Sequence, residues 1–266
     1  MGILRRTTLL GKSNSTCYNL KISIYVSYQT IGGANLMYKE FFAMIKRNKQ
    51  NNTIIIDGVV GVGKSALLEI VAEEFGLDRF LEPVEDNPIL DKFYHNRPRY
   101  AFPLQIFFLN RRFKMLKAAA SLPEPTVMDR SIYGDIIFAK LLNQGGDMEN
   151  DEFELYMDLL VNMLDHIEPP KLMIYLKADT DTAIERIKKR GRDYEQIVER
   201  EYWEALNREY SEYFSEYNLS PLLTIDTKGL DFIGNPEDRD YVVGLIRAKL
   251  QEIDSNTKDQ GIWAEK

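Results

Sequence analysis

The chain has 266 residues, of which 44% are hydrophobic and 28% are charged, the composition of an ordinary globular protein rather than a disordered or fibrous one. Its net charge of −7 gives no overall positive field for a polyanion, which argues against a nucleic-acid-binding protein. Because Cys17 is the only cysteine, we expect neither an intrachain disulfide nor a thiolate metal cluster. No apolar run approaches the roughly eighteen residues that a membrane span needs, so we expect no membrane partner. The expected location is the cytoplasm.

The first fifty residues differ from the rest of the chain. No acidic residue precedes Glu40, whereas arginine and lysine occur among many Ser, Thr and Asn residues. Such a segment fits an organelle transit peptide, a disordered leader, or an extension in front of a start at Met37 or Met44. We expect residues 1–50 to be a dispensable extension, with a transit peptide and an organelle location as the minority alternative.

From residue 51 onward, short apolar runs alternate with stretches of helical periodicity. The apolar runs predict five strands, at residues 53–57, 80–81, 126–128, 172–176 and 222–225. The helical spacing of apolar residues predicts helices at residues 65–75, 99–120, 132–142, 153–167, 181–190, 199–217 and 241–253. This alternation predicts an α/β fold, a parallel sheet with helices on both faces, in one domain over residues 51–254 followed by a polar tail at 255–266.

A glycine-rich segment directly follows the first predicted strand. It matches the phosphate-loop pattern G-x-x-x-x-G-K-[S/T] at every required position, with Gly58, Val59, Val60, Gly61, Val62, Gly63, Lys64 and Ser65. In such a loop, backbone N–H groups and the positive end of the next helix converge on phosphate oxygens. We expect Lys64 to reach the β- and γ-phosphates and Ser65 to ligate Mg²⁺. The loop predicts binding of a nucleoside triphosphate, and by itself leaves a kinase, a GTPase and a motor ATPase open.

A basic cluster follows the fourth predicted strand. Five of the seven residues 186–192 are arginine or lysine, including Arg190 and Arg192. A charge run is ordinarily a solvated helix face, but cations near a phosphate loop can also cover the transferred phosphoryl group. Because no guanine-reading N-K-x-D segment follows a later strand, the pattern favours a small-molecule kinase with an arginine-rich lid.

Further motifs occur in a fixed order along the chain, at residues 82–88, 93–94, 100–105, 129–133, 190–196 and 201–202. Together with the phosphate loop they resemble the deoxynucleoside kinases, most closely the bacterial deoxyadenosine and deoxyguanosine kinases, from about residue 53 to about 251. The resemblance implies a P-loop kinase fold and a homodimer. It also implies that ATP or another nucleoside triphosphate, with Mg²⁺, phosphorylates the 5′-hydroxyl of a deoxyribonucleoside, with deoxyadenosine or deoxyguanosine favoured.

The resemblance also implies catalytic roles for three residues besides Lys64. Glu82, after the second strand, would accept the proton of the attacking 5′-hydroxyl. Asp129, after the third strand, would orient Mg²⁺ or accept that proton, and Arg130 would contact phosphate. The sequence does not decide between the two carboxylates as base, and Glu82 is preferred.

For the deoxynucleoside, the resemblance implies a pocket of five further residues. Tyr94 and Glu201 would bind the sugar 3′-hydroxyl, and Gln105 would hold the base edge, since its amide both donates and accepts hydrogen bonds. Arg112 and Asp135 match a charged pair near the base.

Three alternatives to a purine deoxynucleoside kinase remain at this point. Deoxycytidine kinase is the nearest, because the same scaffold accepts cytosine after small changes in the pocket. Thymidylate kinase shares a phosphate loop and an Asp-Arg pair, but Glu82 would repel its phosphorylated acceptor. A P-loop regulator that binds nucleotide without turnover is the alternative from another class.

Overall fold

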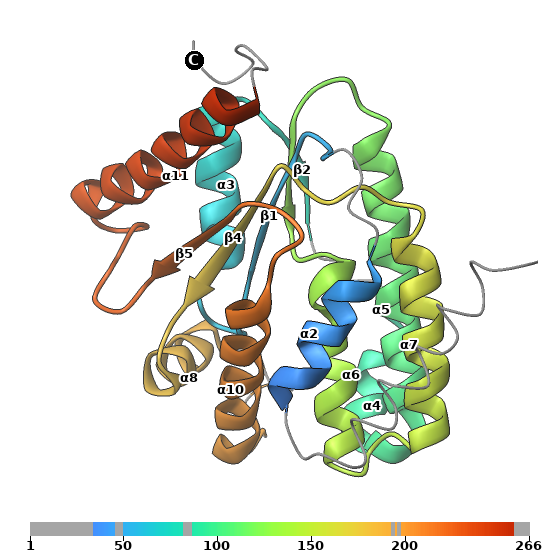
Figure 1. The fold of residues 1–266 in the computed structure, drawn as a ribbon. Helices are drawn as coiled ribbons and strands as arrows, with labels where there is room; N and C mark the ends of the chain where they lie inside the picture. Colours follow the sequence, from blue (N-terminus) through green and yellow to red (C-terminus); the bar gives the residue numbers. More distant parts are fainter. Residues whose placement is uncertain (1–33, 46–49, 82–86, 193–194, 196–197, 258–266) are drawn as a thin grey trace, which may run out of the picture.

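A parallel β-sheet forms the centre of the computed structural model, which describes residues 34–45, 50–81, 87–192, 195 and 198–257 (Figure 1). The strand order is β2-β3-β1-β4-β5. The strands are β1 (Thr53–Gly58), β2 (Asp78–Phe80), β3 (Thr126–Asp129), β4 (Leu172–Lys177) and β5 (Leu222–Asp226). All five predicted strands are present within one to two residues of their expected bounds, and the predicted α/β fold is confirmed.

The register of the central strands brings the ends of β1 and β3 to one edge of the sheet. β1 pairs in parallel with β3 on one side and β4 on the other, with Ile56 opposite Asp129 and Gly58 opposite Leu176. Every residue of β1 is buried, as expected for a β-branched strand covered on both faces. Because ligands in parallel sheets bind beyond the carboxyl ends of the strands, this edge is where an active site is expected.

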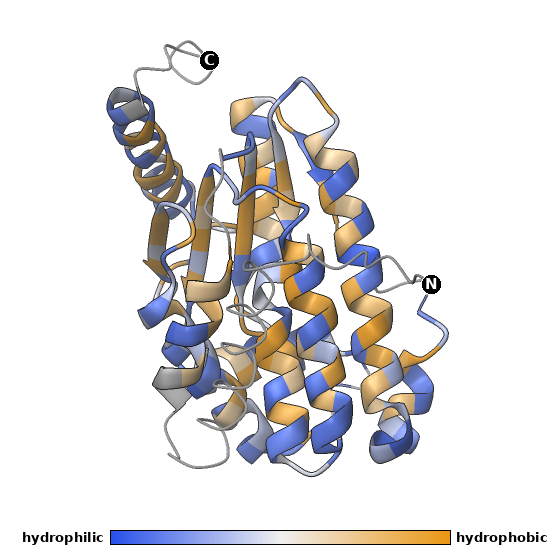
Figure 2. Ribbon diagram, turned by 45° about the vertical axis from the view of Figure 1, so that its right-hand side comes forward, coloured by the Kyte–Doolittle hydropathy of each residue, from blue (hydrophilic) through white to orange (hydrophobic). Residues whose placement is uncertain are grey.

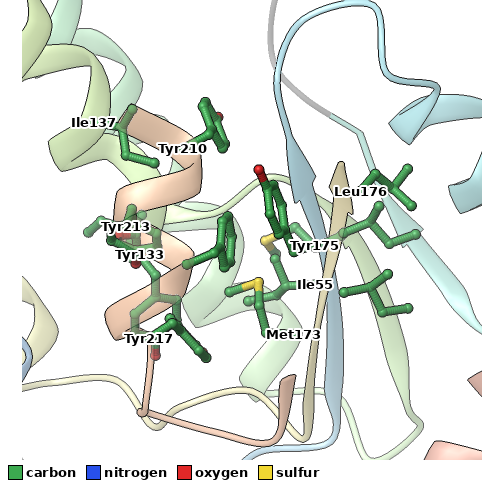
Figure 3. Close-up of a cluster of buried hydrophobic side chains, with 14 of the residues drawn as sticks. Ile55, Tyr133, Ile137, Met173, Tyr175, Leu176, Tyr210, Tyr213 and Tyr217 are labelled. Atoms are coloured by element: carbon green, nitrogen blue, oxygen red, sulfur yellow. Dashed lines mark hydrogen bonds between the residues drawn. The ribbon is translucent and has the colours of Figure 1, made fainter. Parts of the chain in front are cut away.

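Helices cover both faces of the sheet. α3 (Lys64–Phe75) and α11 (Pro236–Thr257) lie on one side, and the other side is covered by a group of helices (Figure 1). These are α5 (Arg97–Ala120), α6 (Asp135–Gln144), α7 (Asn150–Leu164) and α10 (Arg200–Glu216). Figure 2 shows long hydrophobic stretches in the strands, whereas the helices alternate hydrophobic and hydrophilic residues. In Figure 3, Tyr175 and Met173 point toward Tyr210 and Tyr213 of α10 and toward Tyr217 directly after it, and Leu176 points to the opposite face.

Several helix ends differ from the sequence prediction for local reasons. α5 begins at Arg97, two residues early, because Asn96 caps it by accepting a hydrogen bond from the Arg99 N–H. α11 begins at Pro236, five residues early, with a proline and acidic residues in its first turn, where both are favourable. The sequence did not predict the six-residue α4 (Leu90–His95) or the 3₁₀ turn η1 (Ile132–Gly134) before α6. Between β4 and α10, α8 (Thr180–Arg190) ends at Gly191, as predicted.

The largest difference is α2 (Ala34–Met44), which lies inside the predicted extension. Its Tyr38, Phe41 and Phe42 side chains are fully buried. The Phe42 ring packs on Tyr213 of α10 with the ring centroids 5.0 Å apart, and the Tyr38 hydroxyl donates to Glu209 at 2.7 Å. The boundary predicted at residue 50 therefore falls after an element that belongs to the packed body. Residues 1–33, which carry the leader and transit-peptide interpretations, lie outside the described residues.

At the other end of the chain, α11 extends to Thr257, three residues into the segment predicted as a polar tail. The rest of that tail lies outside the described residues. A search of the described helices for one with the length and apolar character of a membrane span found none.

Candidate active site

The phosphate loop connects β1 to α3 at the carboxyl edge of the sheet. Two of its glycines are required by close neighbours as well as by their left-handed backbone. A Cβ atom at Gly61 would lie 2.6 Å from the Ala183 carbonyl oxygen of α8, and one at Gly63 would lie 2.9 Å from the Phe232 ring. Both residues have positive φ, at 83° and 104°. The loop can thus take this path only with glycine at these positions, and α3 then starts at Lys64.

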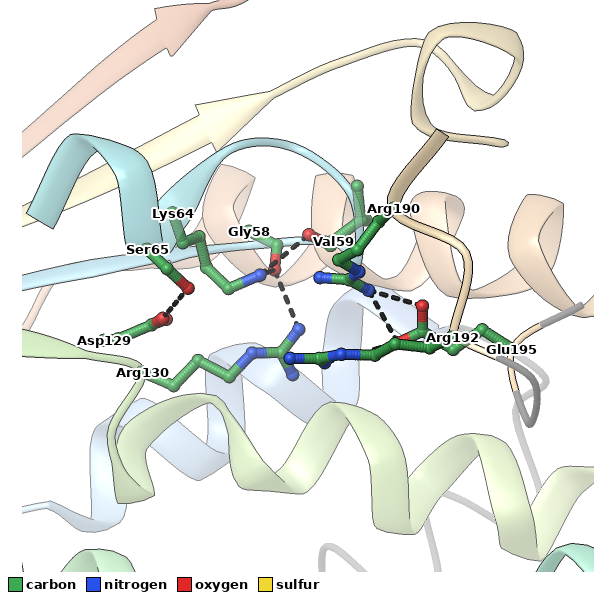
Figure 4. A network of polar contacts seen from close by, with 9 residues as sticks. All are labelled: Gly58, Val59, Lys64, Ser65, Asp129, Arg130, Arg190, Arg192 and Glu195. Atoms are coloured by element: carbon green, nitrogen blue, oxygen red, sulfur yellow. Dashed lines mark hydrogen bonds and ion pairs between the residues drawn. The ribbon is translucent and has the colours of Figure 1, made fainter. Parts of the chain in front are cut away.

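Lys64 is folded back over the start of the loop. Its buried ammonium group donates to the carbonyl oxygens of Gly58, at 3.0 Å, and Val59, at 2.9 Å (Figure 4). These contacts hold a positive charge at the N-terminal end of α3, where the helix dipole also favours an anion. The contact of Lys64 with the β- and γ-phosphates stays a prediction.

Ser65 and Asp129 meet where α3 and β3 approach each other. The Ser65 hydroxyl donates to Asp129 Oδ2 at 2.6 Å (Figure 4). Asp129 is only 3% exposed, and its Oδ1 atom is buried and makes no hydrogen bond within the described part of the chain. A hydroxyl beside a carboxylate oxygen that lacks a partner is a donor set suited to Mg²⁺.

The same edge offers few other metal ligands. No group of three or more His, Cys, Asp or Glu residues that could hold a metal occurs among the described residues.

Arg130 follows Asp129 and has a left-handed backbone, with φ of 59°. A non-glycine residue in this region costs about 1–3 kcal/mol, which the surrounding contacts must offset. Its guanidinium group donates to the Gly58 carbonyl at 3.2 Å and lies 4.8 Å from the centre of the Phe138 ring. The strained turn therefore directs a buried cation at the phosphate loop, as the predicted phosphate contact requires.

The predicted lid arginines lie at the end of α8. Arg190 donates to both carboxylate oxygens of Glu195 at 2.6 Å, and Arg192 lies 3.6 Å from one of them (Figure 4). Glu195 is buried, and sequence reasoning did not single it out. The available signal was its position three residues after the last arginine of the basic cluster. Arg186, from the same cluster, instead joins the loop to the segment after β5 through hydrogen bonds to Val62 and Thr227.

A cavity of about 710 Å³ extends from the phosphate loop to the helices α4, α5 and α6. Its volume is typical of a site for a small molecule. Among the residues predicted to bind phosphate or nucleoside, its lining includes Lys64, Ser65, Asp129, Arg130, Arg190, Arg192, Tyr94, Gln105 and Arg112. The fold thus brings together, from separate elements, most of the residues that the sequence assigned to one site.

The far end of the cavity contains a buried ion pair. Arg112 of α5 and Asp135 at the start of α6 are hydrogen-bonded, and both are almost completely buried. Arg112 also lies over the Phe108 ring at 4.8 Å, and Gln105 is buried on the same face of α5, about two turns earlier. Asp135 Oδ2 makes no hydrogen bond within the described residues. Arg112 and Gln105 line the cavity and offer it hydrogen-bond donors and an acceptor, whereas Asp135 lies behind Arg112 and does not line it.

Three of the residues predicted to bind the nucleoside, Asp135, Glu201 and Glu82, are not among the described residues that line this cavity. Glu201 is exposed and does not line it, and the next two residues of α10, Tyr202 and Trp203, line it instead. Successive residues on a helix point about 100° apart, so Glu201 lies about 200° around the helix from Trp203 and turns to solvent. Glu201 is therefore not a wall of this cavity, and its contact with the sugar stays a prediction. Glu82 lies outside the described residues, although Leu81 before it lines the cavity.

Comparison with known proteins gives one consistent result. The family model described as deoxynucleoside kinase matches residues 54–251. The chain is 39% identical over 209 residues to deoxyguanosine kinase of Lactobacillus johnsonii, covering 75% of this chain and 93% of the relative. It is 35% identical over 206 residues to deoxyadenosine/deoxycytidine kinase of Bacillus subtilis, covering 76% and 95%.

Solved structures that resemble this chain are also deoxynucleoside kinases. The structure of deoxyadenosine kinase from M. mycoides with bound dATP is similar with a TM-score of 0.66 and 33% sequence identity, over 73% of this chain and 98% of that one. The structure of the same enzyme with bound dCTP gives a TM-score of 0.65 and 32% identity, over 74% and 99%. From the phosphate loop, the cavity beside it and these matches, we conclude that the chain belongs to the deoxynucleoside kinase family.

Proposed function

We propose that this protein transfers the γ-phosphoryl group of ATP, or of another nucleoside triphosphate, to the 5′-hydroxyl of deoxyguanosine or deoxyadenosine. The observation that carries the proposal is the single cavity that joins the phosphate loop to the buried Arg112–Asp135 pair. One end suits a triphosphate, and the other suits a base with hydrogen-bonding edges. Such a reaction produces a deoxynucleoside monophosphate for nucleotide salvage.

The residues of the phosphate end act by holding charge in place. Lys64 and Arg130 both contact the Gly58 carbonyl, so their positive groups converge on one point of the loop. Fixed cations in a buried site stabilise the negative charge of phosphoryl transfer without reorganising. Arg190 and Arg192 would add to this from the lid. Glu82 remains the proposed acceptor of the hydroxyl proton, on the resemblance alone.

Ser65 and Asp129 are the residues that would hold Mg²⁺, through the hydroxyl and the carboxylate described above. When bound, the ion neutralises charge on the β- and γ-phosphates. This favours Asp129 as a metal ligand and leaves the proton-accepting role to Glu82.

Deoxycytidine is the second candidate acceptor. The B. subtilis relative acts on both deoxyadenosine and deoxycytidine, so a purine preference does not follow from family membership. The purine is favoured here because the proteins named above include a deoxyguanosine kinase at 39% identity and a deoxyadenosine kinase at 33% identity.

A panel of acceptors tests the proposed function. The full-length protein is incubated with ATP, Mg²⁺ and each of the four deoxynucleosides in turn, and monophosphate is quantified by chromatography. We expect deoxyguanosine or deoxyadenosine to give the highest kcat/KM. A higher value for deoxycytidine or thymidine would overturn the purine assignment, and absence of product from all four would overturn the kinase proposal itself.

The protein is also proposed to be a homodimer, with the paired helices α5 and α7 as the contact. They lie side by side (Figure 1), and Leu155 of α7 is 59% exposed, with Leu159 one turn further on partly buried. Sedimentation equilibrium checks this: we expect twice the chain mass of 30.9 kDa. Replacement of Leu155 by Glu should shift the mass toward one chain, and a single-chain mass for the unchanged protein would contradict the proposal. The cytoplasmic location stays a prediction.

A further inference from the structure

Asp57 is a buried carboxylate next to the phosphate loop to which neither the motif nor the family resemblance assigned a role. It is the next-to-last residue of β1 and is 1% exposed. It does not line the cavity, so it is not placed to touch a substrate. Its Oδ1 atom accepts hydrogen bonds from the Gly58 N–H at 2.7 Å and from the Tyr210 hydroxyl of α10 at 3.1 Å.

The other carboxylate oxygen of Asp57 is enclosed by the segment after β3. A Cβ atom at Gly134 would lie 2.5 Å from Asp57 Oδ2. Gly134 has an ordinary negative φ of −88°, so its backbone does not require glycine, and the close carboxylate does. Three elements therefore converge on Asp57: the start of the phosphate loop, the turn after Arg130, and α10.

Through Gly58, this carboxylate is connected to both catalytic cations. The N–H of Gly58 is held by Asp57, while its carbonyl accepts from Lys64 at 3.0 Å and from Arg130 at 3.2 Å. Tyr210 adds a second connection, because its ring lies 5.9 Å from the Arg130 guanidinium while its hydroxyl binds Asp57. A shift of Asp57 would thus move Gly58 and both cations together.

The positive charges of Arg130 and Lys64 affect the protonation of the buried Asp57 carboxylate. Burial raises the pKa of Asp57, and the nearby positive charges of Arg130 and Lys64 act in the opposite direction. An isolated buried carboxylate is costly, and so is a buried cation without a counter-charge. In its ionised form, Asp57 is the counter-charge of Lys64 and Arg130, and both of these cations line the cavity.

We propose that Asp57 is a positioning residue for phosphoryl transfer. Its carboxylate, which Tyr210 holds in place, positions Gly58, and through Gly58 it positions the Lys64 and Arg130 side chains against the phosphoryl group that is transferred. The proposal rests on the proposed kinase function. It differs from a purely structural role in one measurable respect: loss of the negative charge should lower the rate of the chemical step more than it weakens substrate binding.

Two replacements separate the charge from the hydrogen bond. Asp57→Asn keeps the shape and an acceptor oxygen but removes the charge, and Tyr210→Phe removes only the hydroxyl. We expect Asp57→Asn to lower kcat about ten- to a hundredfold, the cost of a small misplacement of catalytic groups, while KM for ATP and for the deoxynucleoside changes less than about threefold. Tyr210→Phe should show the same pattern with a smaller loss.

Two matched controls lie on the same helix. Glu209→Gln neutralises another buried carboxylate, which binds Tyr38 and Lys140, and Tyr213→Phe removes another buried hydroxyl, which binds the Tyr133 carbonyl. Both should lower the melting temperature and leave kcat within about twofold of the unchanged protein, because neither group contacts the phosphate loop.

The kcat values of these variants can overturn the proposed role of Asp57. A kcat for Asp57→Asn within twofold of the unchanged protein, or one no lower than that of Glu209→Gln, would overturn the proposal. If Asp57→Asn does not fold, Tyr210→Phe with an unchanged kcat would overturn it equally. Failure of the unchanged protein to phosphorylate any deoxynucleoside would instead mean that the proposed function is wrong.

Discussion

Replacing Lys64 with methionine is expected to lower kcat about a hundred- to a thousandfold, the loss that follows removal of one preorganised charge donor. Methionine has nearly the same length and keeps the packing, but it has no ammonium group. In the structure that group is buried and lies within 3.0 Å of two loop carbonyls, so neither water nor a neighbouring lysine can replace it easily. Steady-state kinetics with saturating ATP and deoxynucleoside measure the loss.

The control for this prediction is Lys249→Met, which removes a lysine paired with Glu252 on α11, away from the cavity. That variant should keep the activity of the unchanged protein, and both variants should remain folded by circular dichroism. If Lys64→Met retained more than about a tenth of the unchanged kcat while folded, the phosphate loop would not have the role that we assign to it.

The second large effect concerns stability rather than catalysis. Replacing Phe42 of α2 with alanine is expected to lower the free energy of unfolding by about 3–5 kcal/mol, the usual cost of removing a buried aromatic ring. Phe42 is fully buried, and its ring contacts Tyr213 of α10 and Tyr217, the residue directly after that helix. Urea unfolding measures the change, and kcat per folded molecule should stay near its original value.

The exposed residue Tyr241 of α11 provides the matched control, because 57% of its surface is accessible. Tyr241→Ala should change the free energy of unfolding by no more than about 0.5 kcal/mol. A chain that starts at Met44 lacks Tyr38, Phe41 and Phe42 and should be less stable than Phe42→Ala. Unchanged stability of that shortened chain would mean that α2 is dispensable, as the sequence suggested.

The strands and the phosphate end of the site could be predicted because their signals are local. A β-branched run followed by the glycine-lysine-serine pattern specifies a strand, a loop and a helix start without reference to the rest of the chain. Asp129 and Arg130 could be added from the family resemblance, and their position agrees with it: they stand at the end of β3, which is parallel to β1, and parallel strands end at the same edge.

What could not be predicted depends on tertiary packing. Glu195 and Glu201 both follow the arginine cluster, and only the rotation of α10 and the position of the preceding turn decide which carboxylate is buried beside the arginines. The role of Asp57 was not evident for the same reason, since Tyr210 and Gly134 reach it from distant parts of the chain.

α2 is a different case, because its signal was present and was not used. Tyr38, Phe41, Phe42 and Ile45 have the i, i+3, i+4, i+7 spacing of one helix face, and all four are buried. The basic, acid-poor composition of the first fifty residues favoured a leader, and composition is a weaker indicator than periodicity when a segment contains both.

The central claim is that the cavity brings a deoxynucleoside hydroxyl to the γ-phosphate held by the phosphate loop. The most direct test is to trace a labelled γ-phosphate from ATP to its product. The protein is mixed with Mg²⁺, deoxyguanosine or deoxyadenosine, and ATP labelled in its γ-phosphate, and the products are separated. We expect the label in the 5′-monophosphate of the deoxynucleoside, in amounts equal to the ADP formed. Label found only in inorganic phosphate, or no loss of ATP with either nucleoside, would contradict the account.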